Sequence, residues 1–238
     1  MVVGANGEIG RRMTQARKVE TVLFSGPVGV LEGLWSEGSV GAAALPTAVI
    51  CHPHPAHRGS MHSKVVHTVY RVLEARGHPT LRFNFRGVGK SEGKYSGRDG
   101  EIGDLEAAAA YARGRAGSRP LWIAGFSFGS WIGLNFALRD PDVAIMIGLG
   151  LPASGNVDGR QFEFLDQVPW PFLMVQGDHD RYGSVADITA LRDRLAPLGR
   201  VELRVVAHAD HFFTGKIEAL REALNDGIRA LTSSDASR

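Results

Sequence analysis

The protein has 238 residues, of which 44% are hydrophobic and 22% are charged, and its formal net charge is +2. These proportions are typical of a globular protein with a substantial core, and so small a charge argues against nucleic acid as a partner. The lone cysteine, Cys51, excludes an internal disulfide, and no apolar run reaches the ~20 residues of a membrane helix.

The N-terminal segment 1–18 is polar and contains glycines, and it lacks the long apolar region of a secretory signal. We expect a flexible extension in 1–18, a disordered tail in 234–238, and a cytoplasmic protein that does not associate with membranes. Segments 19–26 and 28–35 are rich in β-branched and aromatic residues and are separated by a Gly-Pro pair, which predicts a β-hairpin.

From residue 47 onward, short apolar runs alternate with segments in which apolar residues recur at helical spacing. The predicted strands cover 47–55, 80–85, 120–126, 143–151, 171–177 and 200–207. The predicted helices cover 62–77, 103–115, 127–138, 185–199 and 217–232. This alternation predicts an α/β fold: one domain (19–233) with a mostly parallel sheet, the hairpin as its antiparallel edge, and helices on both faces.

The stretch WIAGFSFGSWIG places Ser127 where a predicted strand ends and a predicted helix begins. Gly125 and Gly129 flank the serine, which matches the Gly-x-Ser-x-Gly nucleophile elbow. At so tight a turn, larger side chains at the two flanking positions would collide with the helix or strand. The helix N-terminus also directs N–H groups toward developing negative charge. Because a glycine-flanked serine also occurs at ordinary strand–helix junctions, the assignment depends on catalytic partners for Ser127.

A serine nucleophile needs a base that is oriented by a carboxylate, and in this fold their chain order is serine, acid, histidine. Asp178 and Asp180 follow one predicted strand, and His208 and His211 follow the next. Every candidate therefore lies after the carboxyl end of a strand, where the sites of open α/β sheets gather. The ordered set predicts a catalytic triad.

Five stretches of the chain resemble the α/β-hydrolase superfamily: HPHPAHRGSMHSKVV, LRFNFRGVGKSEG, PLWIAGFSFGSW, VQGDHD and HADHFF. Within that superfamily, the chain is similar to small, capless bacterial hydrolases that carry a His-Pro-His-Pro loop. By position, the resemblance implies Ser127 as nucleophile, Asp180 as acid and His211 as base. Asp178 is the alternative acid, or else a loop carboxylate that caps local N–H groups, and His208 is expected to be structural.

The resemblance also implies an oxyanion hole made of two backbone N–H groups. One belongs to Phe128, directly after the nucleophile. The other comes from the His-Pro-His-Pro loop, where His54 is the candidate because the flanking prolines have no N–H. Similar proteins have two glycines in this loop, whereas here Arg58 precedes a single glycine. The residues expected to contact the substrate are Phe126, Trp131 and Met61.

Three other patterns have competing interpretations. GANGEIG at 4–10 resembles a dinucleotide-binding loop, but too short a strand precedes it and no suitable acid ends the next strand. NFRGVGKS resembles a phosphate-binding loop, but Asn84 replaces its first glycine, so Arg86 is expected to make structural hydrogen bonds instead. The loop histidines His52, His54 and His57 include one His-x-His pair, His52 and His54, a spacing that also occurs in zinc sites. A rigid loop is the favoured interpretation, and no metal is expected.

These residues predict a serine hydrolase, a carboxylesterase that cleaves short-chain esters through an acyl-enzyme without a cofactor. A thioesterase or a peptidase/amidase with the same triad is the alternative enzyme, and a non-enzymatic binding protein is the alternative class. Segment 152–170 is too short for a cap of several helices. Phe162, Phe164 and Leu165 are expected to form one apolar turn there. The expected partner is a small acyl ester, and a homodimer is the other association considered.

Overall fold

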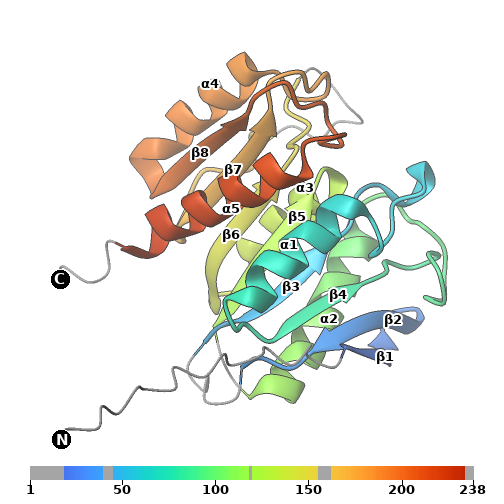
Figure 1. Ribbon diagram of the computed structural model, residues 1–238. Coiled ribbons are helices and arrows are strands. Elements are labelled where there is room, and N and C mark those ends of the chain that lie inside the picture. The colour runs from blue at the N-terminus through green and yellow to red at the C-terminus, as the bar shows by residue number, and fades with distance from the viewer. Residues whose placement is uncertain (1–18, 40–44, 118–119, 155–161, 234–238) are drawn as a thin grey trace, which may run out of the picture.

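The computed structural model describes residues 19–39, 45–117, 120–154 and 162–233 (Figure 1). The flexible extension expected at 1–18, with its glycine motif, and the tail expected at 234–238 lie outside these residues.

The described residues form one eight-stranded sheet with the order β1-β2-β4-β3-β5-β6-β7-β8. The strands are β1 (Val19–Gly26), β2 (Gly29–Ser36), β3 (Thr47–Cys51), β4 (Thr80–Phe83), β5 (Leu121–Phe126), β6 (Val143–Leu149), β7 (Phe172–Gly177) and β8 (Val201–Val206). From β4 to β8 every neighbouring pair is parallel, whereas β2 pairs antiparallel with both β1 and β4. The predicted hairpin is confirmed, and with it the mostly parallel sheet with an antiparallel N-terminal edge.

Helices cover both faces of the sheet, as predicted (Figure 1). They are α1 (Lys64–Ala75), α2 (Asp99–Ala116), α3 (Phe128–Ala137), α4 (Val185–Leu195) and α5 (Ile217–Thr232), with short 3₁₀ turns at Pro55–His57 and Ala196–Leu198. The apolar residues of α1 and α5 join one core, and those of α2, α3 and α4 join the other. Within the described residues, none of these helices has the length and apolar character needed to cross a membrane.

The central strands divide their side chains between the two cores because successive residues of a strand point to opposite faces. In β3, Ala48 and Ile50 belong to the core beneath α1 and α5, and Val49 and Cys51 belong to the core beneath α2 and α3. All five residues of β3 are buried. This burial explains why its sequence is a continuous apolar run rather than an alternating one.

Helix α2 begins at Asp99, four residues before the predicted start at 103, and this boundary is a correction. In the structure Gly100 lies inside the first turn, and a Cβ on it would collide with the Ser96 hydroxyl and the Arg86 guanidinium. Arg86 Nη2 also donates a 2.5 Å hydrogen bond to the Gly100 carbonyl oxygen. The glycine is therefore required for close packing and does not break the helix.

The described residues of the connection between β6 and β7, 150–154 and 162–171, contain no large cap, as predicted. Its described residues form turns rather than helices, and the amide of Leu165 donates a 3.1 Å hydrogen bond to the carbonyl oxygen of Phe162. Arg194 of α4 donates to both of these residues' carbonyl oxygens, at 2.7 Å for Phe162 and 3.0 Å for Leu165. The expected apolar turn therefore forms and is held against α4.

Candidate active site

Ser127 occupies the turn between β5 and α3 with an unusual backbone conformation. Its φ and ψ angles are 54° and −116°, values that a residue with a side chain adopts only under strain. Its amide donates a 2.8 Å hydrogen bond to the carbonyl oxygen of Leu149, and its own carbonyl oxygen accepts from the Ser130 hydroxyl at 2.6 Å. The surrounding structure thus holds the strained serine, as the nucleophile elbow requires.

The two flanking glycines are both required for steric reasons. A Cβ on Gly125 would collide with the backbone of Gly129. A Cβ on Gly129 would lie 2.6 Å from the carbonyl oxygens of Cys51 and His52, at the end of β3. Strand β5, helix α3 and the loop after β3 therefore meet backbone to backbone around the serine.

The structure brings Ser127, His211 and Asp180 into one line of contacts. His211 Nε2 is 2.9 Å from Ser127 Oγ, and His211 Nδ1 is 2.7 Å from Asp180 Oδ2. The three residues are 8%, 6% and 4% exposed, respectively. An ionised carboxylate only accepts hydrogen bonds, so His211 Nδ1 carries the proton of the neutral ring. Nε2 is then the nitrogen able to accept the serine proton.

Asp180 is held by further donors that the sequence analysis did not identify. Gln176 Nε2 donates to Asp180 Oδ2 at 2.8 Å, and the Tyr182 amide donates to Oδ1 at 2.8 Å. Gln176 is fully buried, and it also donates to the Gly183 carbonyl oxygen and accepts from the Leu151 amide. Its position at the end of β7 looked like an ordinary strand residue, and a polar side chain in an otherwise apolar run was the one available indication.

Asp178 and His208 lie apart from these contacts. Asp178 Oδ1 accepts a 3.2 Å hydrogen bond from the amide of Ala209, which is the local capping role considered as its alternative. His208 is exposed and has a left-handed backbone, with φ at 54°. Its ring lies 5.6 Å from that of His179, so its surroundings are the surface rather than the core.

The loop after β3 is tied to the end of β4 by His52. The Phe85 amide donates to His52 Nε2 at 3.1 Å, so His52 Nδ1 carries the proton and donates to the Pro53 carbonyl oxygen at 2.6 Å. Burial lowers the pKa of His52 to about 4, which keeps the ring neutral. With both ring nitrogens engaged, His52 fixes the loop and has no lone pair to offer a metal.

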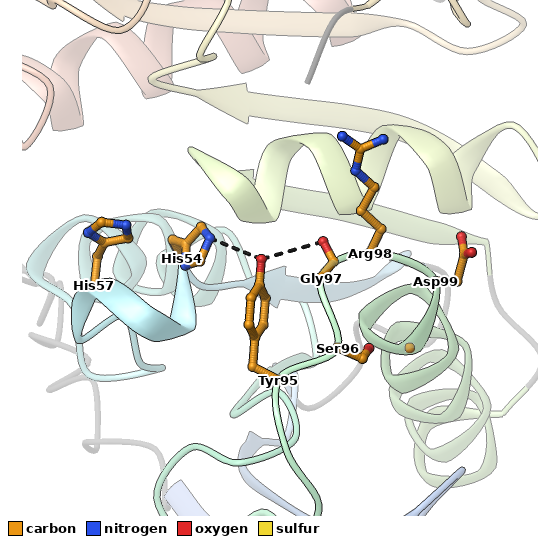
Figure 2. Close-up of a pocket in the computed structure, with 8 residues that line it drawn as sticks. His54, His57, Tyr95, Ser96, Gly97, Arg98 and Asp99 are labelled. Carbon is orange, nitrogen blue, oxygen red and sulfur yellow. Dashed lines mark hydrogen bonds between the residues drawn. The ribbon is translucent and has the colours of Figure 1, made fainter. Parts of the chain in front are cut away.

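His54 follows in the same loop and lies beside the first residue of α3. Its ring centroid is 5.1 Å from that of Phe128. His54 Nδ1 accepts from the Ala56 amide at 3.1 Å, so Nε2 carries the proton and contacts the Tyr95 hydroxyl at 3.0 Å (Figure 2). Arg58, which precedes the single glycine of this loop, adopts the left-handed φ of 61° that favours glycine.

A pocket of about 720 Å³ adjoins this loop and the start of α2 (Figure 2). Its lining is largely polar and comes from the loop after β3, the loop before α2 and the first two residues of α2: His54, His57, Tyr95, Ser96, Gly97, Arg98, Asp99 and Gly100. The Arg98 side chain points toward α3 in Figure 2, and its guanidinium carbon lies 5.3 Å from the Trp131 ring centroid. This open space is of ligand size and is not lined by Ser127, Asp180 or His211. Two of its wall residues, His54 and Tyr95, contact Phe128, the residue after Ser127, with ring centroids 5.1 Å and 5.9 Å away.

The three residues expected to contact substrate are mostly covered. Met61 and Phe126 are each 1% exposed, and Trp131 is 6% exposed. Phe126 packs behind His211, with ring centroids 5.2 Å apart. All three side chains therefore present little surface to a substrate. Phe212, which the sequence analysis passed over, is 55% exposed, with its ring centroid 5.1 Å from that of His211.

The stretch NFRGVGKS has the structural role that was predicted for it. Arg86 forms a buried ion pair with Asp104, with Nη2 to Oδ1 at 2.7 Å and Nε to Oδ2 at 3.0 Å. Glu32 Oε2 accepts hydrogen bonds from the Lys90 amide and the Asn84 side chain, both at 2.9 Å. These contacts use the loop's polar groups internally. Cys51 is a buried core residue, and burial raises the pKa of its thiol, which disfavours the reactive thiolate.

The strand order, the strained serine and the serine–histidine–aspartate contacts are the features of an α/β hydrolase. The family model described as an alpha/beta hydrolase domain matches residues 46–232, and the chain belongs to this family. A protein of Rickettsia prowazekii named Uncharacterized protein RP471 is 34% identical over 216 residues, which cover 89% of this chain and 90% of that protein.

Two solved structures are similar along nearly their whole length. An alpha-beta serine hydrolase homologue from Coxiella burnetii is 38% identical, with a TM-score of 0.78, and the match covers 87% of this chain and 96% of that one. An α/β serine hydrolase without a lid from Xanthomonas campestris is 33% identical, also with a TM-score of 0.78, covering 90% and 94%. The missing lid of the second structure agrees with the short connection after β6.

Proposed function

We propose that the protein is a serine hydrolase that cleaves short-chain carboxylic esters with Ser127, His211 and Asp180. The observation that carries this proposal is the unbroken line of contacts, 2.9 Å from Ser127 Oγ to His211 Nε2 and 2.7 Å from His211 Nδ1 to Asp180 Oδ2. A binding protein has no need for a strained serine aligned with a base and its orienting carboxylate.

In this mechanism, His211 Nε2 takes the hydroxyl proton as Ser127 Oγ attacks the ester carbonyl carbon. Asp180 stabilises the resulting imidazolium. The backbone N–H groups of Phe128 and His54 donate to the oxyanion of the tetrahedral intermediate. Collapse of the intermediate breaks the bond to the alcohol oxygen, which leaves with the proton from His211. Water then attacks the acyl-enzyme, with His211 as base, and releases the acid and the serine hydroxyl.

The size and polarity of the adjoining pocket support short, polar substrates. The pocket is open and lined by polar groups such as Tyr95 and Arg98, and the described residues between β6 and β7 form only turns. A long aliphatic chain gains binding energy only where apolar walls bury it. Thioesters and amides pass through the same type of tetrahedral intermediate, so activity tests include one of each.

Labelling with a fluorophosphonate probe tests this proposal directly, because the probe reacts with activated serines. We expect the wild-type protein to be labelled on Ser127 and to hydrolyse p-nitrophenyl acetate. Ser127→Ala should lose both properties while keeping its circular dichroism spectrum and Tm, since alanine removes only the hydroxyl. An unlabelled but folded wild-type protein, or Ser127→Ala activity within tenfold of wild type, would exclude Ser127 as the nucleophile.

A further inference from the structure

A second cluster of polar side chains lies on the loops that carry Asp180 and His211 but outside the catalytic contacts. Asp178 and His179 follow β7, and His208 follows β8. Each offers one potential ligand atom, and these three atoms lie within 4.8 Å of one another. Of the residues that the structure describes, they are the one such group of three or more histidine, cysteine or carboxylate side chains.

The backbone beneath this cluster is held by hydrogen bonds between the two loops. The Asp178 amide donates to the Val206 carbonyl oxygen at 3.2 Å, and the His179 amide donates to the Ala209 carbonyl oxygen at 2.9 Å. In return, the Ala209 amide donates to Asp178 Oδ1 at 3.2 Å. The left-handed φ of 54° at His208 places this residue opposite His179, with ring centroids 5.6 Å apart. These hydrogen bonds therefore fix the backbone from which the three side chains extend.

Two imidazoles and one carboxylate form a donor set that suits divalent transition metals. Zn²⁺ binds imidazole nitrogen and carboxylate oxygen in tetrahedral geometry, in which neighbouring ligand atoms are ~3.4 Å apart for bonds of ~2.1 Å. The His179 and Asp178 side chains are 64% and 30% exposed, so short rotations can close the remaining gap. Mg²⁺ and Ca²⁺ prefer sets made of oxygen alone.

We propose that Asp178, His179 and His208 bind a divalent transition-metal ion, Zn²⁺ in preference to Mg²⁺, with water completing the coordination. The ion joins the loop after β7 to the loop after β8. Because these loops carry Asp180 and His211, the ion stabilises the part of the fold that holds the acid and the base. It contacts none of the three triad residues, so binding and activity are measured separately.

The experiment titrates ZnCl₂ into the full-length, tag-free, EDTA-treated protein by isothermal titration calorimetry, with MgCl₂ in a parallel run. We expect one saturable Zn²⁺ site per chain and no Mg²⁺ binding. At Zn²⁺ concentrations of about a hundred times Kd, Tm should rise by roughly 5 °C or more. His179→Gln combined with His208→Gln should abolish binding and the Tm increase, and Asp178→Asn should weaken affinity by at least about tenfold.

Three control variants separate this site from the other histidines. His62→Gln changes an exposed histidine away from the cluster, His57→Gln changes the partner of His54, and His211→Gln removes the proposed base. All three should keep wild-type Zn²⁺ affinity. The proposal is overturned if the wild type shows no saturable binding, if the double variant binds as well as wild type, or if any of the three controls loses the site. The Tm of each variant in EDTA verifies that it is folded.

Discussion

Gln176 donates a hydrogen bond of 2.8 Å to Asp180 Oδ2, the same oxygen that faces His211. The Gln176 side chain is fully buried. It also donates to the Gly183 carbonyl oxygen and accepts from the Leu151 backbone amide. A buried carboxylate that receives several hydrogen bonds has a single preferred orientation. Gln176 is therefore a positioning residue for the proposed acid.

Replacing Gln176 with leucine should reduce both activity and stability. It leaves the Leu151 amide and the Gly183 carbonyl buried without this partner, at a cost of about 1–3 kcal/mol for each group. We expect kcat to fall by roughly tenfold with KM little changed, because the loosened Asp180 orients His211 less well. Ser154→Ala is the matched control, since Ser154 bonds to Ser184 and Asp187 nearby without touching Asp180. If both variants lose stability and neither loses kcat, Gln176 is structural only.

Single asparagine substitutions separate the two candidate acids. Asp180→Asn should lower kcat by ~10⁴-fold, because an amide favours the wrong tautomer of the catalytic histidine. Asp178→Asn should cause only a mild loss, since its carboxylate contacts the Ala209 amide rather than His211. Steady-state kinetics on one activated ester, measured without added metal, compare the two variants. The reverse ranking would assign the acid to Asp178.

The buried His52 should make stability depend on pH in a defined window. Its pKa in the folded state is about 4, below the ordinary value of 6.5, so between these values the unfolded chain binds a proton that the folded chain does not. Stability is therefore unaffected by this group above pH ~6.5, falls as the pH is lowered toward ~4, and loses about 3 kcal/mol in total. Urea unfolding at pH 7.5 and 4.5 measures the change. His52→Gln should show a smaller change, and equal changes would contradict the role of His52.

Acyl chain length should reveal how shallow the site is. Each buried CH₂ contributes ~0.8 kcal/mol, so kcat/KM should rise by about fourfold per carbon while the chain is covered and then stop. We expect p-nitrophenyl esters of about two to six carbons to react faster than longer ones, with no activation at a lipid interface. A preference for long chains would contradict the open site. In that case, sedimentation would determine whether a second copy of the chain supplies the cover.

Much of this arrangement is predictable because the proposed catalytic residues follow strands in a set order. Ser127 and His211 each stand at a recognisable point after an apolar run, and their meeting follows from the parallel sheet. The choice between Asp178 and Asp180 depends on how the loop after β7 bends. The identity of the two aspartates does not reveal that bend. The left-handed backbone of Arg58 is likewise not apparent from the sequence, because the packing of its loop sets it.

The substrate-facing residues were the least predictable part of the site. Phe126 and Met61 are apolar, and an apolar side chain near a nucleophile can either contact a substrate or fill the core. Both are buried, whereas the exposed Phe212 sits directly after the proposed base. Where the backbone turns, the local sequence does not show which apolar side chain faces solvent and which fills the core.

The contact at Gly129 has a consequence for how such an enzyme changes over evolution. Here the carbonyl oxygens of Cys51 and His52 press against the helix without any intervening side chain. Main-chain atoms therefore meet directly between α3 and the loop that carries His54. Substitutions in the pocket wall, at residues such as Tyr95 or Arg98, can alter which molecules fit while this contact stays constant. Substrate preference and reaction chemistry can thus diverge independently, and new specificities can arise without rebuilding the machinery that breaks the bond.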